Sequence, residues 1–347
     1  MDSIINVRDC GAVGDGRTDD TDAIRKAAEH LPPKDGVLCF PPGWYRTDTI
    51  RARSFTTYWG GAAWAYSYRP PGGTVLSPVR EDQPCLFSVE DAHGVRFHGL
   101  TLRGTVPGDD PRWPAEGLPG DMHGVRFLSA DQAVVDDCRI ERFTGHGLLF
   151  AGGAGVWSVR HSLILFNRRN GIEASASADS WILDTQLTSN GEAGAVLHAS
   201  ATVTGNRIEH NYRAGIRIAS GYASSIQITG NLFCCNGGPA LEHEEGRAEG
   251  ITVTGNTFRR LVDVAAPADA ELNTHARLID FQGLVFTGNS LYCDRQTRSV
   301  ATGMILARLC DSVVSRNALF HAATRQLIDD RGGHQNTVIA DNPGRLL

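Results

Sequence analysis

The chain has 347 residues, of which 41% are hydrophobic and 21% are charged, and its formal net charge is −6 at pH 7. No basic block is present, so nucleic acid is not an expected partner. No apolar run reaches the roughly 18 residues that a membrane span requires, so we expect no membrane partner either.

The N-terminus and the cysteines bear on the cellular location. The first residues lack the charged and apolar regions of a signal peptide. The 8 cysteines are scattered and show neither CxxC pairs nor zinc-site spacing. These features favour reduced thiols and a cytoplasmic location, although a secreted chain from which a leader had been removed would look the same.

Residues 18–32 predict a short helix near the N-terminus. The Thr18-Asp19-Asp20-Thr21 segment is typical of a helix start, and apolar residues then recur at helical spacing as far as Pro32. Such a helix would cover the open sheet edge at the start of a β-fold.

Two segments interrupt the regular pattern that follows. Residues 51–74 are rich in aromatic side chains, and residues 103–122 contain several acidic ones. Loops on a rigid scaffold often carry binding residues, so we predict that these segments wall a binding site. The predicted binding residues in them are Trp59, Trp64, Tyr66, Tyr68 and Trp113.

A phrase with an asparagine at its centre recurs along the rest of the chain. The asparagines of this phrase are Asn206, Asn231, Asn256, Asn289, Asn317 and Asn342, and earlier copies have Cys138, Ser162 and Thr185 in the same slot. Alternating apolar residues, typical of short strands, follow several copies. Asparagine tolerates the left-handed conformation of a tight corner, and its side chain can bond to its copy one turn above.

A period of about 24 residues with short strands and stacked asparagines is typical of a parallel β-helix. We therefore predict an all-β fold: a single right-handed parallel β-helix of about ten coils with an N-terminal capping helix. The whole of 1–347 would be one domain. Residues 1–50 would form the cap and first coil, 51–74 and 103–122 the loop insertions, and 123–345 the regular coils.

The N-terminal segments also carry a resemblance to a known family. The residues NVRDCGAVGDG at 6–16, TDDT at 18–21 and GVLCFPPGWY at 36–45 resemble the opening of the pectate-lyase-like superfamily. That group includes polygalacturonases, polysaccharide lyases, uronate epimerases and phage tailspikes. Together with the coils, the resemblance covers nearly the whole chain and implies the fold, but fold alone does not carry function.

In this superfamily the outer face of the first strand of each coil lines the substrate groove. Strand alternation turns Glu173 outward, and the same register aligns Arg126, Leu149, Val196 and Arg217 with it. The predicted catalytic residues on or just before these strands are His146, Glu173, Arg126, Asp121 and His123. Such a set can transfer protons and recognise an anion, whereas the structural alternative is a solvated polar face.

A second group of polar residues lies farther along the chain, and we predict that it binds substrate. It comprises His198, Arg217 and Glu242, with His243 and Glu244 next to them. The Gly145-His146-Gly147 segment resembles the Gly-His-Gly of polygalacturonases, but the rest of that pattern is missing. A galacturonan hydrolase of the usual kind is therefore disfavoured.

Lyases and epimerases of this fold fit better, because they neutralise a uronate carboxylate and then take the proton on the adjacent carbon. Either Arg217 or His146 could serve as the base, with Arg126 as the neutralising group. We predict a carbohydrate-active enzyme of this kind with no cofactor. Calcium is used by some members, but Asp121, Glu173 and Glu242 are too dispersed to assign a calcium site.

Two alternatives stay open. One is an intracellular biosynthetic isomerase or cyclase that holds a small-molecule substrate in an apolar pocket behind residues 58–68. The other is a phage-type rod that binds or depolymerises glycans. The partner is accordingly a carbohydrate or a small molecule, and a homo-oligomer is left open.

Overall fold

The computed structural model describes residues 3–63, 71–107, 120–243, 245–260, 270–294 and 300–346. Their contacts divide the chain into two units. Unit 1 comprises residues 1–110 and 114–181, and unit 2 comprises residues 182–347 together with 111–113. The prediction of a single domain stays a prediction.

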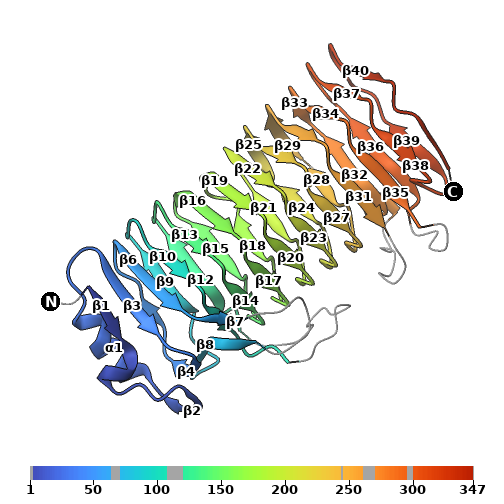
Figure 1. Cartoon of the computed structure of the whole chain (residues 1–347). Helices are drawn as coiled ribbons and strands as arrows, with labels where there is room; N and C mark the ends of the chain where they lie inside the picture. The colour runs from blue at the N-terminus through green and yellow to red at the C-terminus, as the bar shows by residue number, and fades with distance from the viewer. Residues whose placement is uncertain are drawn as a thin grey trace. The chain divides into compact units, whose positions relative to one another are not determined.

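In unit 1 the chain passes repeatedly through three parallel sheets, which we name C1, A1 and B1 in the order in which each coil enters them (Figure 1). Sheet C1 contains β5 (Ile50–Arg51), β9 (Cys85–Glu90), β12 (His123–Leu128), β15 (Leu148–Ala151) and β18 (Ile172–Ala174). Sheet A1 contains β1 (Ile4–Asn6), β3 (Gly36–Phe40), β6 (Thr56–Gly60), β10 (Arg96–His98), β13 (Val134–Asp136) and β16 (Gly155–Arg160). Sheet B1 contains β2 (Asp15–Asp19), β4 (Gly43–Thr47), β8 (Gly72–Pro78), β11 (Thr101–Arg103), β14 (Arg139–Glu141) and β17 (Leu163–Leu165), and β7 (Ala62–Ala63) pairs antiparallel with β8.

Unit 2 repeats this arrangement with sheets C2, A2 and B2 and adds a small sheet, D2. Sheet C2 contains β21 (Ala195–Leu197), β24 (Ile216–Ile218), β28 (Leu241–His243), β32 (Thr274–Ile279), β36 (Thr302–Ala307) and β39 (Gln326–Asp330). Sheet A2 contains β22 (Ala201–Thr204), β26 (Gln227–Thr229), β30 (Thr252–Thr254), β34 (Val285–Thr287), β37 (Val313–Ser315) and β40 (Val338–Ala340). Sheet B2 contains β20 (Gln186–Thr188), β23 (Arg207–Glu209), β27 (Leu232–Cys234), β31 (Thr257–Arg260), β35 (Ser290–Cys293), β38 (Ala318–Phe320) and β41 (Gly344–Arg345). Sheet D2 contains β25 (Gly221–Ser224), β29 (Gly246–Glu249) and β33 (Phe281–Gln282), and β19 (Ala178–Leu183) contains the division between the units.

These stacked parallel sheets confirm the predicted all-β parallel β-helix. The first fifty residues, predicted to form the cap and first coil, contribute β1 and β3 to A1 and β2 and β4 to B1. The N-terminal segment therefore forms coils of its own as well as a cap.

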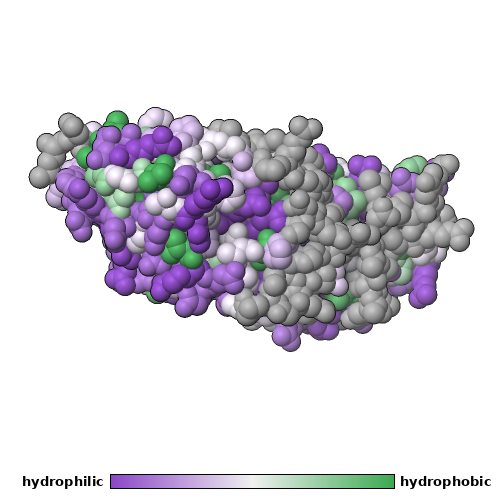
Figure 2. Space-filling model, turned by 90° about the horizontal axis from the view of Figure 1, so that it is seen from below, coloured by the Kyte–Doolittle hydropathy of each residue, from purple (hydrophilic) through white to green (hydrophobic). Residues whose placement is uncertain are grey.

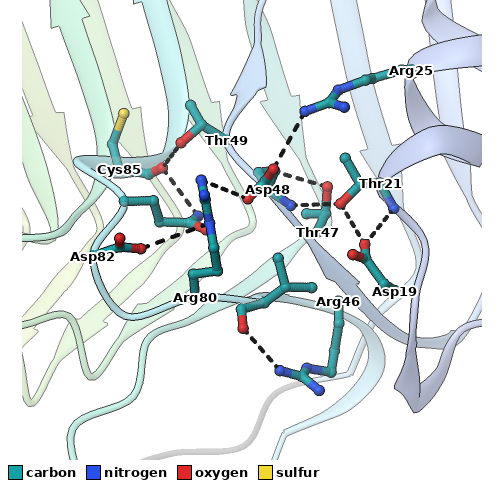
Figure 3. A network of polar contacts seen from close by, with 12 residues as sticks. Asp19, Thr21, Arg25, Arg46, Thr47, Asp48, Thr49, Arg80, Asp82 and Cys85 are labelled. Carbon is teal, nitrogen blue, oxygen red and sulfur yellow. Dashed lines mark hydrogen bonds and ion pairs between the residues drawn. The ribbon is translucent and has the colours of Figure 1, made fainter.

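The predicted N-terminal helix is confirmed as α1 (Thr21–Glu29), which lies beside β1 and β3 at the N-terminal end of unit 1 (Figure 1). Ile24 and Ala27 on its inner face are buried. The side chain of Asp20 does not cap the helix. Instead, the hydroxyl of Thr21 accepts a hydrogen bond from the backbone N–H of Asp48 at 2.8 Å, which joins the helix to the loop after β4 (Figure 3).

Two short 3-10 turns, η1 (Val7–Cys10) and η2 (Ala270–Leu272), are the remaining helical segments among the described residues. No helix in the described ranges is long and apolar enough to cross a membrane. The face in Figure 2 is mainly hydrophilic where residues are described, with small hydrophobic patches between the polar ones.

Inward-facing aromatic rings fill the interior of unit 1. The ring of Tyr58 stacks on Phe97 with a centroid distance of 5.4 Å, and Phe150 stacks on Trp157 at 3.9 Å. All four residues are at most 1% exposed. Burying side chains of this size contributes about 1.5–3 kcal/mol each, so these rings account for much of the stability of the coils.

The predicted asparagine ladder is present in unit 2. Its members are Asn206, Asn231, Asn256, Asn289, Asn317 and Asn342, and the Nδ2 atom of each donates to the Oδ1 atom of the next at 2.9–3.0 Å. In unit 1 Ser162 occupies the equivalent position, and its hydroxyl accepts a hydrogen bond from the backbone N–H of Cys138, one coil earlier, at 3.1 Å. The structure adds a second ladder that the repeat phrase did not reveal, in which Asn190 donates to Asn211 and Asn211 donates to Asn236 at the corner before C2.

The conformational part of the prediction needs a correction. The left-handed residue at these corners is the one before each asparagine, with φ of 72° at Gly205, 66° at Gly230 and 65° at Gly255. Glycine adopts this conformation without a steric penalty, which leaves the asparagine free to turn its side chain into the ladder.

We expect Asn231→Ala to lower the free energy of unfolding by about 2–4 kcal/mol, because it leaves the buried backbone and side-chain N–H groups of Asn206 without an acceptor. Urea unfolding followed by circular dichroism, which reports on the strands of both units, measures this loss. The control is Gln227→Ala, an exposed residue of the same coil, which should change stability by less than about 0.5 kcal/mol. Equal unfolding midpoints for the two variants would show that the ladder does not stabilise unit 2.

Candidate functional site

The predicted outward column on sheet C1 is confirmed. Ser88, Arg126, Leu149 and Glu173 lie opposite one another on β9, β12, β15 and β18. Their neighbours along each strand, such as Val125 and Phe127, are buried inside the coil. The residues of this column therefore face outward, as strand alternation requires.

Two histidines stack at the corner where the chain leaves B1 and enters C1. The rings of His123 and His146 lie 5.2 Å apart and are inclined by only 11°. Both residues are more than nine-tenths buried, with 8% and 6% exposed. The close approach requires glycine at position 145, because a Cβ atom there would lie 2.5 Å from Nδ1 of His123 and 2.9 Å from the Asp121 carboxylate.

The next coil hydrogen-bonds to each ring. The backbone N–H of His146 donates to Nδ1 of His123 at 3.0 Å, and the backbone N–H of Asn170 donates to Nδ1 of His146 at 3.2 Å. A nitrogen that accepts a hydrogen bond carries no proton, so a neutral ring here has its proton on Nε2. The basic Nδ1 lone pair of each imidazole therefore accepts a backbone N–H group, and the polar hydrogen of the neutral ring is the one on Nε2.

The same asparagine positions the carboxylate of the cluster. Asn170 is 1% exposed, and its side-chain Nδ2 donates to Oε2 of Glu173 at 2.6 Å. Oε1 of Glu173 accepts from the backbone N–H of Ser175 at 3.1 Å. Asn170 therefore contacts His146 through its backbone and Glu173 through its side chain, and it holds a donor and an acceptor in a fixed relation.

Two ion pairs flank these groups. Arg126 pairs with Glu90, and their side chains are 30% and 47% exposed. Nε of Arg169 lies 3.2 Å from the carboxylate of Asp121, and both side chains are about half exposed. Neither Glu90 nor Arg169 was predicted. Alternation in β9, which buries Phe87 and Val89, would have shown that Glu90 points outward, whereas no pattern signals the reach of Arg169.

Burial lowers the pKa of His123 to about 4, partly offset by the nearby Asp121 carboxylate. The ring therefore stays neutral through the weakly acidic range. This agrees with the hydrogen bond from His146, which needs an unprotonated Nδ1 atom.

The second predicted group lies in unit 2. Val196, Arg217 and Glu242 share the predicted register on β21, β24 and β28, which continues to Arg277 on β32. The predicted exposure of Val196 and Glu242 is wrong, because they are only 2% and 5% exposed. His198 follows β21 and is partly exposed. His243 is fully buried, and its Nδ1 atom lies 2.6 Å from the carbonyl oxygen of Ile279, so it belongs to the core.

The predicted aromatic wall is only partly described. Trp59 lies on β6 of sheet A1, with Tyr58 buried on the inner side, and so it belongs to a different sheet from Arg126 and Glu173. The prediction that Trp59 walls the C1 site is corrected accordingly, because Trp59 is part of a regular strand and not of a projecting loop. The predicted residues that lie outside the described ranges are Trp64, Tyr66, Tyr68, Trp113 and Glu244.

All eight cysteines are free thiols. Across the described ranges, no group of three or more histidine, cysteine, aspartate or glutamate side chains is arranged to hold a metal ion.

Comparisons with known proteins agree with the β-helix fold. Residues 123–266 match the family described as a right-handed β-helix region, and residues 4–66 match the family described as rhamnogalacturonase A/epimerase, pectate lyase-like. The chain is therefore a right-handed parallel β-helix. No curated protein sequence matches it significantly.

Several solved β-helix structures are similar to the chain. DFA-IIIase from Arthrobacter chlorophenolicus A6 without its lid is 16% identical, with a TM-score of 0.73 over 100% of this chain and 99% of that one. PfbA, a surface adhesin of Streptococcus pneumoniae, is 15% identical, with a TM-score of 0.68 over 99% and 92%. The family 28 exopolygalacturonase of Yersinia enterocolitica is 14% identical, with a TM-score of 0.61 over 98% and 79%. At these identities the likeness shows the β-helix fold.

We expect the buried His123 to make the β-helix less stable as the pH falls. When the protein unfolds, the ring regains an ordinary pKa of about 6.5, so between pH 6.5 and 4 the unfolded chain binds a proton that the folded chain does not. Stability contributed by the neutral ring is therefore complete above pH 6.5 and lost as the pH falls toward 4. Between pH 7 and pH 5 the wild-type chain should lose about 2 kcal/mol more than His123→Gln.

Chemical denaturation of both proteins at a series of pH values measures this difference. Parallel stability curves for wild type and His123→Gln would contradict a lowered pKa of this ring.

Proposed function

We propose that the β-helix is a carbohydrate-active enzyme that removes a proton from a uronate-type sugar bound on the outer face of C1. The observation that carries this proposal is the hydrogen-bonded chain from His146 through Asn170 to Glu173. It fixes an N–H donor and a carboxylate on neighbouring coils, next to the outward guanidinium of Arg126.

Glu173 is the base in this proposal. The sequence predicted Arg217 or His146 as the base. Arg217 belongs to unit 2, and the Nδ1 lone pair of His146 accepts the backbone N–H of Asn170. In its neutral form this imidazole therefore offers a proton and does not take one. The carboxylate of Glu173 is held by two neutral donors, Asn170 and Ser175, and it can still accept a proton.

Arg126 recognises the carboxylate of the sugar. To do so, Arg126 has to break its ion pair with Glu90 and form one with the substrate. The free energy that this requires depends on how exposed the side chains of Arg126 and Glu90 are. Partly exposed ion pairs contribute only about 0–1 kcal/mol, so a substrate carboxylate can displace Glu90 readily. The backbones of Arg126 and Glu173 lie two strands apart, about 10 Å, a span that their long side chains allow them to share around one sugar ring.

The reaction follows from these roles. Glu173 takes the proton from the carbon next to the uronate carboxylate, and the electron pair left behind delocalises into that carboxylate, which Arg126 neutralises. In an elimination the bond between the next carbon and its glycosidic oxygen breaks, an imidazole Nε2–H group hydrogen-bonds to the leaving oxygen, and a water molecule protonates that oxygen. In an epimerisation a water molecule on the opposite face returns a proton to the same carbon. In both reactions the hydroxide that is formed takes up the proton held by Glu173.

The comparisons support a carbohydrate substrate. One matching family is described as rhamnogalacturonase A/epimerase, pectate lyase-like, and one similar structure is an exopolygalacturonase. Hydrolysis is the second candidate, but it needs two carboxylates about 5–9.5 Å apart on either side of the bond. The other predicted acid, Asp121, is ion-paired with Arg169, which makes it a poor second acid and favours a single base.

The biosynthetic alternative required an apolar pocket behind residues 58–68. Among the described residues of that segment, Tyr58 is fully buried and packs against Phe87 and Phe97 with centroid distances of 5.2 and 5.4 Å. The interior at this point is filled by aromatic rings, which favours a site on the outer surface of the coil.

We expect Glu173→Gln to lower turnover of a uronate polymer by about 10²–10⁴-fold, since the amide keeps the shape of the side chain but cannot take the proton. Polygalacturonate and alginate are the test substrates, and ultraviolet absorbance reports new unsaturated ends. Glu29→Gln on the exposed face of α1 is the matched control and should keep full turnover.

Arg126→Ala and His146→Ala should also lose activity while circular dichroism shows an intact β-helix. Full activity in all three site variants would rule out the assignment. If only Arg126→Ala lost activity, the result would support substrate binding on C1 but would rule out Glu173 as the base.

A further inference from the structure

The outer face of sheet A1 carries a second row of aromatic and charged side chains that the proposed reaction does not use. Trp59, His98, Asp136 and Arg160 lie opposite one another on β6, β10, β13 and β16. Successive members are about 4.8 Å apart, so the row forms a flat strip across four coils. It lies on a different sheet of unit 1 from Arg126 and Glu173.

Asp136 is the centre of the polar part of this strip. Its carboxylate lies 3.2 Å from Nε of Arg160, 3.0 Å from Nδ1 of His161 and 3.3 Å from Nδ1 of His98. Because Nδ1 faces the carboxylate in both histidines, the Nε2 edge of each ring is directed away from it. The side chain of His98 is 41% exposed, so a ligand can reach it.

Trp59 provides the apolar part. It is 43% exposed, and its indole N–H has no hydrogen-bond partner in the described part of the chain. Trp44 is equally exposed, but its indole N–H donates to the hydroxyl of Ser77 at 2.7 Å. An exposed indole ring does not stabilise a strand face that is in contact with water. Aromatic side chains that carry a polar group, such as tryptophan, are instead typical of binding surfaces.

Arg96 adds a positive charge beside the ring. It is exposed on β10, two residues before His98, so the two side chains share the outer face, and it lies opposite Thr57 of the strand that carries Trp59. Arg160 is already paired with Asp136, so Arg96 is the cation that this strip offers to a ligand among the described residues. A ligand with negative charge suits this surface.

We propose that this strip binds an acidic saccharide without acting on it. The ring of a sugar stacks on Trp59, its carboxylate pairs with Arg96, and its hydroxyls bond to His98 and Asp136. This site is additional to the C1 site and does not rest on the proposed reaction, because it needs only binding.

The test uses the full chain carrying Glu173→Gln, so that turnover cannot remove the probe. Isothermal titration with fragments of polygalacturonate should resolve two binding sites, and Trp59→Ala and Arg96→Ala should each weaken one of them about tenfold or more, the effect of losing roughly 1.4 kcal/mol, and leave the other unchanged. The control is Tyr222→Ala, a 52% exposed aromatic residue of unit 2, which should leave the affinity unchanged.

The two sites are separable in this experiment. Binding that is lost in Arg126→Ala but kept in Trp59→Ala and Arg96→Ala would overturn the A1 site and leave the C1 site standing. Equal affinity of the strip for polygalacturonate and for a neutral glucan of the same length would overturn the assignment of an acidic ligand. Circular dichroism of each variant confirms that the coils are intact.

Discussion

The hydrogen-bonded register between successive coils is the constraint on which the rest of the structure depends. Each strand pairs in parallel with its equivalent one coil away, at about 4.8 Å, so every position lies over the same position of the next coil. In unit 2 this stacks Asn206 on Asn231 and joins their amides in a ladder. In unit 1 it stacks His123 on His146 and turns a backbone N–H of one coil toward the imidazole of the coil before it. The same repetition therefore stabilises the fold and orients the candidate site.

Much of this could be predicted from the sequence, because its asparagine and apolar positions recur with a period of about 24 residues, and this period sets the register between coils. Strand alternation was enough to turn Arg126, Leu149 and Glu173 outward, and the recurring asparagine was enough to locate the corners. What the sequence could not show depends on the reach of side chains across coils. The pairing of Arg126 with Glu90 and of Arg169 with Asp121 joins residues 36 and 48 positions apart, and no local pattern encodes it.

Backbone hydrogen bonds have the largest effect on which chemical role each residue of the site can have. From residue types alone, His146 serves equally well as a base or as a donor. The N–H of Asn170 occupies its Nδ1 atom, and the amide of the same asparagine holds Glu173, which is why we propose the carboxylate as the base. Burial has a parallel effect on His123, whose pKa is lowered to about 4 and whose ring stays neutral as a result. The protein backbone thus decides which imidazole nitrogen can carry a proton in each neutral ring.

The measurement that tests the central claim most directly is mass spectrometry of polygalacturonate and alginate after incubation with the β-helix in heavy water. Proton abstraction by Glu173 predicts fragments with an unsaturated end, shorter by the elements of water, or uncleaved chains that carry deuterium at the carbon next to the carboxylate. Fragments that gain water and carry no deuterium on carbon would contradict this account, because they require hydrolysis by a pair of acids and no removal of that proton.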